Sequence, residues 1–494
     1  MIHRVLFAGL PALALTACMV GPNYQRPSAP VPATYKELQG WKVSRPRDNA
    51  DRGIWWSIYQ DPELDELERQ IDISNQNIQA AAAAYLQASA LAREARSSLF
   101  PSVSLGLGAT RQASSRGGAS AGTTGAGGNT ITNSSSGPQT SYNLESSASW
   151  DLDLWGKIRR GEESAVANAQ ASAAELASAR LSAQASLATN YFNLRAADQL
   201  QHLLDKAVDA YKESLRITHN QYAAGVATRL DVITAQTQLQ AAQAQAINVG
   251  VQRAIYEHAI AVLIGKPPAE FALAPGELTA TVPKVPVAVP STLLERRPDI
   301  AAAERQMVAA NAQIGVADAA FYPDISLSAL LGFVGSPLAT LVSTSNRVWS
   351  LGAAASENLF NGGENSAAVS AAEAAYDESV ANYRQTVLTA FQGVEDQLAT
   401  VRILEQEAVV QDSAVQAAGQ AVQISLNQYR AGTVTYTTVV TAQATLLADQ
   451  QQSLTIQQNR LVASVTLIED LGGGWTAAQL PTPEDVKKGK AGDQ

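Results

Sequence analysis

Four stretches of the chain alternate apolar and polar residues with a period of two. They lie at about 101–111, 141–155, 324–333 and 347–360. In the second stretch the apolar positions are Tyr142, Leu144, Ala148, Trp150, Leu152 and Leu154. This alternation predicts four β-strands, each with one apolar and one polar face. Such strands fit the wall of a membrane barrel, with lipid outside and water inside, and equally a half-exposed sheet in a soluble sandwich.

Long helical stretches follow each predicted pair of strands. Proline is absent from 139–266 and from 338–480. Between Val369 and Val401 the apolar residues recur in nine steps over 32 residues, which is the helical period. Sixty helical residues would reach about 90 Å, too long for a globular domain. The stretch after the first strand pair has two apolar faces, which suits the wall of a helical tube as well as a plain bundle.

A glycine interrupts each of the long helical stretches once. We expect Gly225 and Gly432 to end one helix in the left-handed conformation. Thr228, with Asp231 three residues later, predicts a capping box for the next helix. Each stretch is therefore predicted to fold back on itself as a helical hairpin.

The chain contains one unit twice, because its motifs recur in the same order at offsets between 205 and 222 residues. The matching segments are 100–105 with 322–327, 154–156 with 359–363, 221–225 with 428–432, and 263–265 with 470–472. The predicted division is a first repeat at 62–265, a Pro-rich linker at 266–298, a second repeat at 299–474 and a C-terminal tail at 475–494. Each repeat is expected to contain a helix, two strands and a long helical hairpin.

The first residues have the pattern of an export signal. A short basic region is followed by an apolar run that ends at Leu15-Thr16-Ala17-Cys18. Such a run is too short to span a bilayer as a helix and is typical of a secretory signal. The small residues before the single cysteine resemble a bacterial lipobox, which implies a signal peptide at 1–17, a covalent lipid on Cys18 and an extended, lipid-anchored segment at 18–61.

Composition argues against several classes of function. The chain of 494 residues has a net charge of −10, which disfavours a nucleic-acid-binding surface. One cysteine and four histidines exclude disulfide stapling and leave little for a metal site or a catalytic triad. The Gly-x-Ser-x-Gly pattern at 118–122 lacks the strand-turn-helix context of a hydrolase. We therefore expect no enzyme activity, no metal site and no cofactor besides the lipid.

Four strands per chain are too few to close a membrane barrel, because the smallest ones have about eight. The chain is therefore expected to oligomerise. Two copies would supply eight strands and three copies twelve, and the alternation pattern does not choose between these assemblies.

Several motifs resemble those of the outer-membrane factor family, distant relatives of TolC, and in particular its lipoprotein branch that includes OprM and NodT. The resemblance covers nearly the whole mature chain. It rests on Cys18–Tyr24, Asp153–Gly156, Glu295–Ile300, Ala310–Val316, Leu359–Gly363 and Leu471–Trp475. It implies an α+β membrane protein, a homotrimer whose twelve-stranded β-barrel in the outer membrane, four strands per chain, continues into a long α-helical barrel in the periplasm.

The same resemblance implies a function and partners. Family members are exit channels of tripartite efflux systems and conduct substrates passively from a periplasmic adaptor and an inner-membrane transporter, which we expect to be driven by protons. The alternatives are a channel for type I protein secretion or a non-conducting helical lipoprotein scaffold. Which substrate passes is left open.

Position in the family implies roles for residues at the two hairpin tips. The residues expected at the periplasmic gate are Tyr222, Asp231, Tyr429, Arg430, Thr437 and Thr441. The residues expected to contact the adaptor are Gly225, Val226, Gly432 and Thr433. The family often has leucine at position 437 and aspartate at position 441, whereas this chain has threonine at both. Asp231 is therefore left as the residue whose copies in the three subunits are expected to form an acidic ring.

Each of these residues also has a purely structural interpretation. Asp231 could act only as a helix cap. Tyr222 and Tyr429 could pack between helices. The glycines could simply satisfy the turns.

Overall fold

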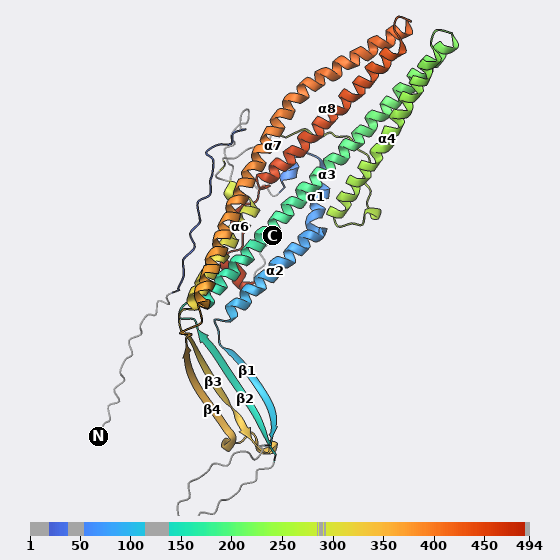
Figure 1. Ribbon diagram of the computed structural model, residues 1–494. Coiled ribbons are helices and arrows are strands. Elements are labelled where there is room, and N and C mark those ends of the chain that lie inside the picture. The colour runs from blue at the N-terminus through green and yellow to red at the C-terminus, as the bar shows by residue number, and fades with distance from the viewer. Residues whose placement is uncertain are drawn as a thin grey trace, which may run out of the picture.

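The computed structural model describes residues 19–37, 54–113, 138–283, 285, 290 and 293–489. The predicted signal peptide and Cys18 lie outside these residues. Figure 1 shows an elongated molecule in which a four-stranded sheet continues end to end into long helices. Within the described part of the chain, none of the helices combines the length and apolar character that a bilayer span requires.

The sheet is an antiparallel meander with two free edges, in the order β1-β2-β3-β4. The strands are β1 (Ser102–Gln112), β2 (Gln139–Leu152), β3 (Asp324–Gly335) and β4 (Arg347–Ser356). The register places Leu107 opposite Leu144, Trp150 opposite Leu327, and Leu331 opposite Trp349. Apolar residues therefore face apolar residues at most positions of one face of the sheet, as the alternation predicts; Ser146 and Arg347 are exceptions, opposite Leu105 and Phe333.

Two strands end earlier than predicted. Alternation suggested that β2 continues to 155, but it ends at Leu152. The Asp153 carboxylate accepts hydrogen bonds from the backbone N–H groups of Ile158 and Arg159, at 3.0 Å each. These bonds tie Asp153 to the first turn of the next helix, so the strand stops before it. Strand β4 ends at Ser356 instead of 360 because its last partner is Asp324, and Pro323 before it has no N–H to extend the pairing.

Two helical hairpins form most of the molecule. They are α3 (Lys157–Ala223) with α4 (Arg229–Leu263), and α7 (Glu364–Arg430) with α8 (Tyr436–Asp470). The helices α3 and α7 have 67 residues each, so each is about 100 Å long. Both run from the sheet to the far end of the molecule, where the chain turns back (Figure 1). Helix α3 contacts α2 (Gln76–Ser97) and α6 (Pro298–Ala319) as well as α4 and α8. Val166 and Ala169 pack against Ala92 of α2, and Ala174 packs against Ala301 of α6, so the predicted apolar residues of α3 have neighbours on more than one side.

Shorter helices surround the lower half of the hairpins. They are η1 (Trp55–Tyr59), α1 (Pro62–Ser74), α2 (Gln76–Ser97), η2 (Pro268–Glu270), α5 (Leu293–Arg296), α6 (Pro298–Ala319), η6 (Ala477–Gln479) and α9 (Pro483–Lys488); η4 (Leu338–Thr340) and η5 (Thr344–Asn346) lie between β3 and β4. The single helix predicted before the first strand is two helices, because the Asn75 side chain ends α1 and caps α2 by accepting from Asn77 N and Ile78 N.

The main hydrophobic core lies where these short helices meet the hairpins. It contains Tyr59 and Phe192, whose rings are 4.8 Å apart, and Tyr383 and Leu461 from the second hairpin. The C-terminal tail adds a small separate cluster, in which Val486 of α9 is fully buried against Ala92 and Val166. The described parts of the linker and tail thus contain short helices.

Candidate functional site

Both hairpin tips have the turn geometry that the glycines predict. Gly225 and Gly432 have φ angles of +76° and +74°, in the region that favours glycine. Val226 is 68% exposed, and Thr433 closes its turn by donating from N and Oγ1 to the Gln428 carbonyl, at 2.9 Å each. The residues expected to contact an adaptor therefore lie at the exposed ends of the two hairpins.

Asp231 forms the predicted capping box with Thr228. Its carboxylate accepts from Thr228 N and Thr228 Oγ1, at 2.8 Å each, and Asp231 N donates to Thr228 Oγ1. At the second tip, α8 begins after Thr435 without a side-chain cap. There Thr441 and Thr437 are both exposed, and Thr441 Oγ1 donates to the Thr437 carbonyl at 3.0 Å. The two tips thus differ in charge and in capping.

The two tyrosines expected at the gate lie in different surroundings. Tyr222 is 45% exposed, whereas Tyr429 is 5% exposed and packs between the hairpins. The Tyr429 ring centroid lies 5.3 Å from that of Tyr436, and its hydroxyl donates to Thr218 Oγ1 at 3.3 Å. Arg430, the last residue of α7, is exposed beside it. Tyr429 therefore joins one hairpin to the other, while Tyr222 and Arg430 face outward.

Two further bonds between the hairpins involve residues that sequence reasoning did not select. Gln221 Nε2 donates to the Tyr429 carbonyl at 3.2 Å, and Gln443 Nε2 donates to Ser214 Oγ at 2.9 Å. A spacing signal was available. The polar residues Ser214, Thr218 and Gln221 on α3 fall at helical spacing, and Tyr436 and Gln443 on α8 are seven residues, or two helical turns, apart.

Burial keeps the tyrosines of this contact protonated. It raises the pKa of Tyr436 to about 12 and also raises the pKa of Tyr429. Both hydroxyls therefore remain available as hydrogen-bond donors at neutral pH.

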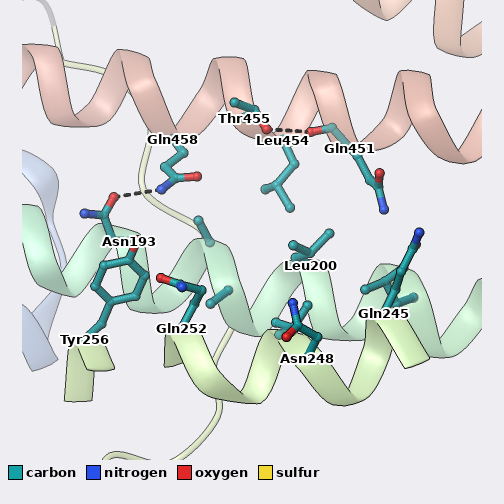
Figure 2. A pocket seen from close by; sticks show the side chains of 14 residues that line it. Asn193, Leu200, Gln245, Asn248, Gln252, Tyr256, Gln451, Leu454, Thr455 and Gln458 are labelled. Carbon is teal, nitrogen blue, oxygen red and sulfur yellow. Dashed lines mark hydrogen bonds between the residues drawn. The ribbon is translucent and has the colours of Figure 1, made fainter. Parts of the chain in front are cut away.

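A cavity of about 420 Å³ lies lower down, between α3, α4 and α8. Figure 2 shows that it is lined by amides, among them Asn248 and Gln252 of α4 and Gln451 of α8. One bond crosses it, in which Gln458 Nε2 donates to Asn193 Oδ1 at 2.8 Å (Figure 2). At this height the two hairpins therefore meet through amides as well as through an apolar cluster that includes Leu204 and Leu447.

Three of the sequence motifs converge where the sheet meets the helices. The segment after Cys18 packs so closely there that a Cβ on Gly21 would lie 2.4 Å from Gly315 Cα. Arg160, 2% exposed, donates to the carbonyls of Val20 and Gly21, both at 3.2 Å, and to Asn23 Oδ1 at 2.9 Å. Residues 20–23 are thus held at the start of α3.

The other two family motifs inside the helical region also meet each other. Arg297 donates to the carbonyl and to Oδ1 of Asp470, at 2.9 Å each. A Cβ on Gly472 would lie 2.0 Å from the Arg296 carbonyl oxygen. These contacts connect the start of α6 with the end of α8. Among the described residues, no group of three or more His, Cys, Asp or Glu side chains is arranged to hold a metal ion.

The chain has a small sheet with two free edges, and this sheet continues end to end into helical hairpins about 100 Å long. This architecture is that of one subunit of an elongated oligomeric channel. The family model for outer membrane efflux proteins matches residues 68–266 and 289–473, one match for each repeat. The chain belongs to this family of channel proteins of the outer membrane, whose fold is a trimer with a β-barrel and a long helical barrel.

Individual relatives agree with this assignment. The chain is 32% identical over 481 residues to the antibiotic efflux pump outer membrane protein ArpC of Pseudomonas putida, covering 96% of both chains. It is 33% identical over 431 residues to the pyoverdine export outer membrane protein OpmQ of Pseudomonas aeruginosa, covering 87% of this chain and 89% of the relative. The solved structure of the outer-membrane channel OprN has a TM-score of 0.84 and 29% identity, over 93% of this chain and all of OprN.

Proposed function

We propose that the protein is the outer-membrane exit channel of a tripartite efflux system. The observation that carries the proposal is the architecture, in which a sheet with free edges continues into two long hairpins whose tips carry exposed turns. Membership of the outer membrane efflux protein family and relatives named as efflux and export proteins support it. Conduction is passive, and the energy comes from partners.

The partners in this proposal are a periplasmic adaptor and an inner-membrane transporter driven by protons. The adaptor binds the hairpin tips at Gly225 and Val226 and at Gly432 and Thr433. The relatives named above differ in what they export, an antibiotic in one case and pyoverdine in the other. This difference supports a channel whose transporter, rather than its lining, selects the substrate.

The gate in this proposal is the contact between the tips of the two hairpins. Side chains on the tips, Tyr222, Asp231, Arg430, Thr437 and Thr441, line the aperture. The bonds of Tyr429 to Thr218 and of Gln443 to Ser214 hold the hairpins together in the closed channel. Adaptor binding separates them.

The proposal also includes a covalent lipid on Cys18 as an anchor in the outer membrane. Labelling cells with radioactive palmitate tests it. We expect label in the purified protein and none in Cys18→Ser, and an equally labelled Cys18→Ser protein would contradict it.

Locking the hairpins together tests the channel function. In a strain whose own copy is deleted, Ser214→Cys with Gln443→Cys is closed by a short bis-methanethiosulfonate cross-linker, which forms a disulfide with each cysteine. This protein should lose export and recover it when the disulfides are reduced. Ser102→Cys with Ser149→Cys is the matched control, since those hydroxyls lie 2.9 Å apart on strands that are already paired. Full export by the locked protein, or loss of export in the control as well, would contradict the proposal.

A further inference from the structure

The two repeats each contain a junction where a strand passes into a long helix. In the first repeat this is 154–156, between β2 and α3, and Trp155 is its aromatic residue. The Trp155 ring stacks on Tyr322 at 4.8 Å between centroids, and Trp155 Nε1 donates to the Pro323 carbonyl at 2.9 Å. Tyr322 and Pro323 directly precede the neighbouring strand, β3. The first junction is therefore closed within one chain.

The second junction is open. It lies at 359–363, between β4 and α7, and Phe360 occupies the position of Trp155. Leu359 and Phe360 are 91% and 92% exposed. No described atom lies within 4 Å of the place that a Cβ on Gly362 would take. Two adjacent large apolar side chains with this exposure indicate a surface that is covered by a partner.

The second repeat junction has a matching aromatic-proline pair, but this pair lies at the opposite edge of the sheet. Phe100-Pro101 precedes β1 and corresponds by repeat to Tyr322-Pro323. Phe100 is 61% exposed. Strands β1 and β4 are the two edges, three strand spacings or about 14 Å apart. Phe360 and Phe100 of one chain are therefore at opposite edges of the sheet, and each lacks the partner that its repeat counterpart has.

We propose that Phe360 of each protomer packs against Phe100 and Pro101 of the next protomer, in the way that Trp155 packs against Tyr322 and Pro323 within one chain. A second copy of the chain is the partner, and the contact repeats at every boundary between protomers. The inference rests on the trimeric fold of the family and not on what the channel conducts.

The edge strands support this arrangement. Where β4 of one protomer meets β1 of the next, each presents apolar residues on one face, and these residues are 67% to 77% exposed in the single chain. They are Trp349 and Leu351 on β4 and Val103, Leu105 and Leu107 on β1. All five have odd numbers, so pairing an odd residue of β4 with an odd residue of β1 keeps one face apolar around the boundary, whereas a one-residue shift would break it.

Cross-linking tests the contact directly. Cys18 is the only cysteine in the chain, so Phe360→Cys with Phe100→Cys introduces one new pair. With a short thiol-specific cross-linker, we expect dimers and trimers on a denaturing gel. Trp155→Cys with Tyr322→Cys is the matched control and should cross-link within one chain, without dimers. If the protein is a trimer in which the control pair cross-links but the test pair does not, the inference is overturned and the channel proposal stands. Absence of any trimer would overturn the channel proposal as well.

A double-mutant cycle separates this contact from general exposure to lipid. Phe360→Ala and Phe100→Ala should each speed dissociation of the detergent-extracted trimer about fivefold, the usual value of an aromatic pair. The double variant should be no faster than the faster single variant, because both remove the same contact. Phe321→Ala, an aromatic that is 49% exposed and outside the contact, should leave the rate unchanged. Effects of Phe360→Ala and Phe100→Ala that multiply in the double variant would overturn the inference.

Phe360→Trp should slow the dissociation of the trimer, whereas the alanine variants speed it. It supplies the indole N–H that donates to a proline carbonyl in the first repeat, so the trimer should dissociate about fivefold more slowly. Faster dissociation of Phe360→Trp would contradict the proposed geometry.

Discussion

The hydroxyl of Tyr429, on α7, donates a hydrogen bond of 3.3 Å to Thr218 Oγ1, on α3, and so connects the two helical hairpins just below their tips. The two residues are 211 positions apart in the chain. With the bonds of Gln221 and Gln443, this contact holds the hairpins together at the end of the molecule where we propose the gate.

Removing the Tyr429 hydroxyl should favour the open channel. A neutral hydrogen bond contributes about 1 kcal/mol. If it exists only in the closed state, Tyr429→Phe should raise the open-to-closed ratio about fivefold. Single-channel recordings in planar bilayers measure this ratio. Tyr85→Phe is the control, because Tyr85 is a buried tyrosine on α2 and lies outside the hairpin tips. An equal change in both variants would remove Tyr429 from the gate.

Asp231 caps a helix, and we propose that it also places a charge at the aperture. Asp231→Asn removes the charge but keeps an oxygen that can accept from Thr228 N, whereas Asp231→Ala removes both. We expect both variants to lose cation preference in the open pore, and only Asp231→Ala to lose about 1 kcal/mol of stability. Reversal potentials and thermal unfolding measure the two effects. Asp485→Ala breaks the capping box with Thr482 in α9 and should leave ion selectivity unchanged. Unchanged selectivity in both Asp231 variants would limit Asp231 to capping.

Arg160 should hold the segment at 20–23 in place. Arg160→Ala removes the donor to Val20, Gly21 and Asn23. Hydrogen bonds from charged groups contribute about 1.5–3 kcal/mol, so chymotrypsin should cleave after Tyr24 at least about tenfold faster while the protein still reaches the outer membrane. Arg159→Ala is the matched control, because Arg159 binds Asp153 and not this segment. Equal cleavage rates in the two variants would contradict the role of Arg160.

Glu68 should make the protein less stable as the pH rises. It is fully buried on α1, and its carboxylate oxygens accept no hydrogen bond from the described residues. Burial, with the nearby carboxylates of Asp72 and Asp65, raises the pKa of Glu68 from 4.5 to about 9. The native state therefore holds this proton more tightly than the unfolded state, and stability is lost progressively between these two pH values.

Thermal unfolding at several pH values measures the effect of Glu68. Glu68→Gln, which has no proton to lose, should raise the unfolding temperature at pH 8 and flatten its decline between about pH 5 and pH 9. Glu66→Gln on the exposed side of the same helix should leave the decline as in the parent, since the Glu66 side chain is 62% exposed. A parent protein whose unfolding temperature rises over this interval would contradict the prediction.

Much of the fold could be predicted because its signals are local. Period-two alternation located all four strands within a few residues, and Gly225 and Gly432 located both hairpin tips. The predicted ends of β2 and β4 were wrong. A hydrogen bond to Asp153 ends β2, and the missing N–H of Pro323 ends the pairing of β4. Neither effect depends on the alternation of apolar and polar residues. Asp231 was predicted as a cap from its three-residue spacing to Thr228, and the cap is confirmed.

The sequence by itself determined the repeat, the strand faces and the hairpins, because the periods of strands and helices are properties of neighbouring residues. Only the tertiary structure decided which distant residues meet. It placed Tyr429 against Thr218 and Arg160 against Asn23, and it left Phe360 without a partner within the described chain. Such contacts depend on the path of the chain between segments hundreds of residues apart, and no local pattern encodes that path.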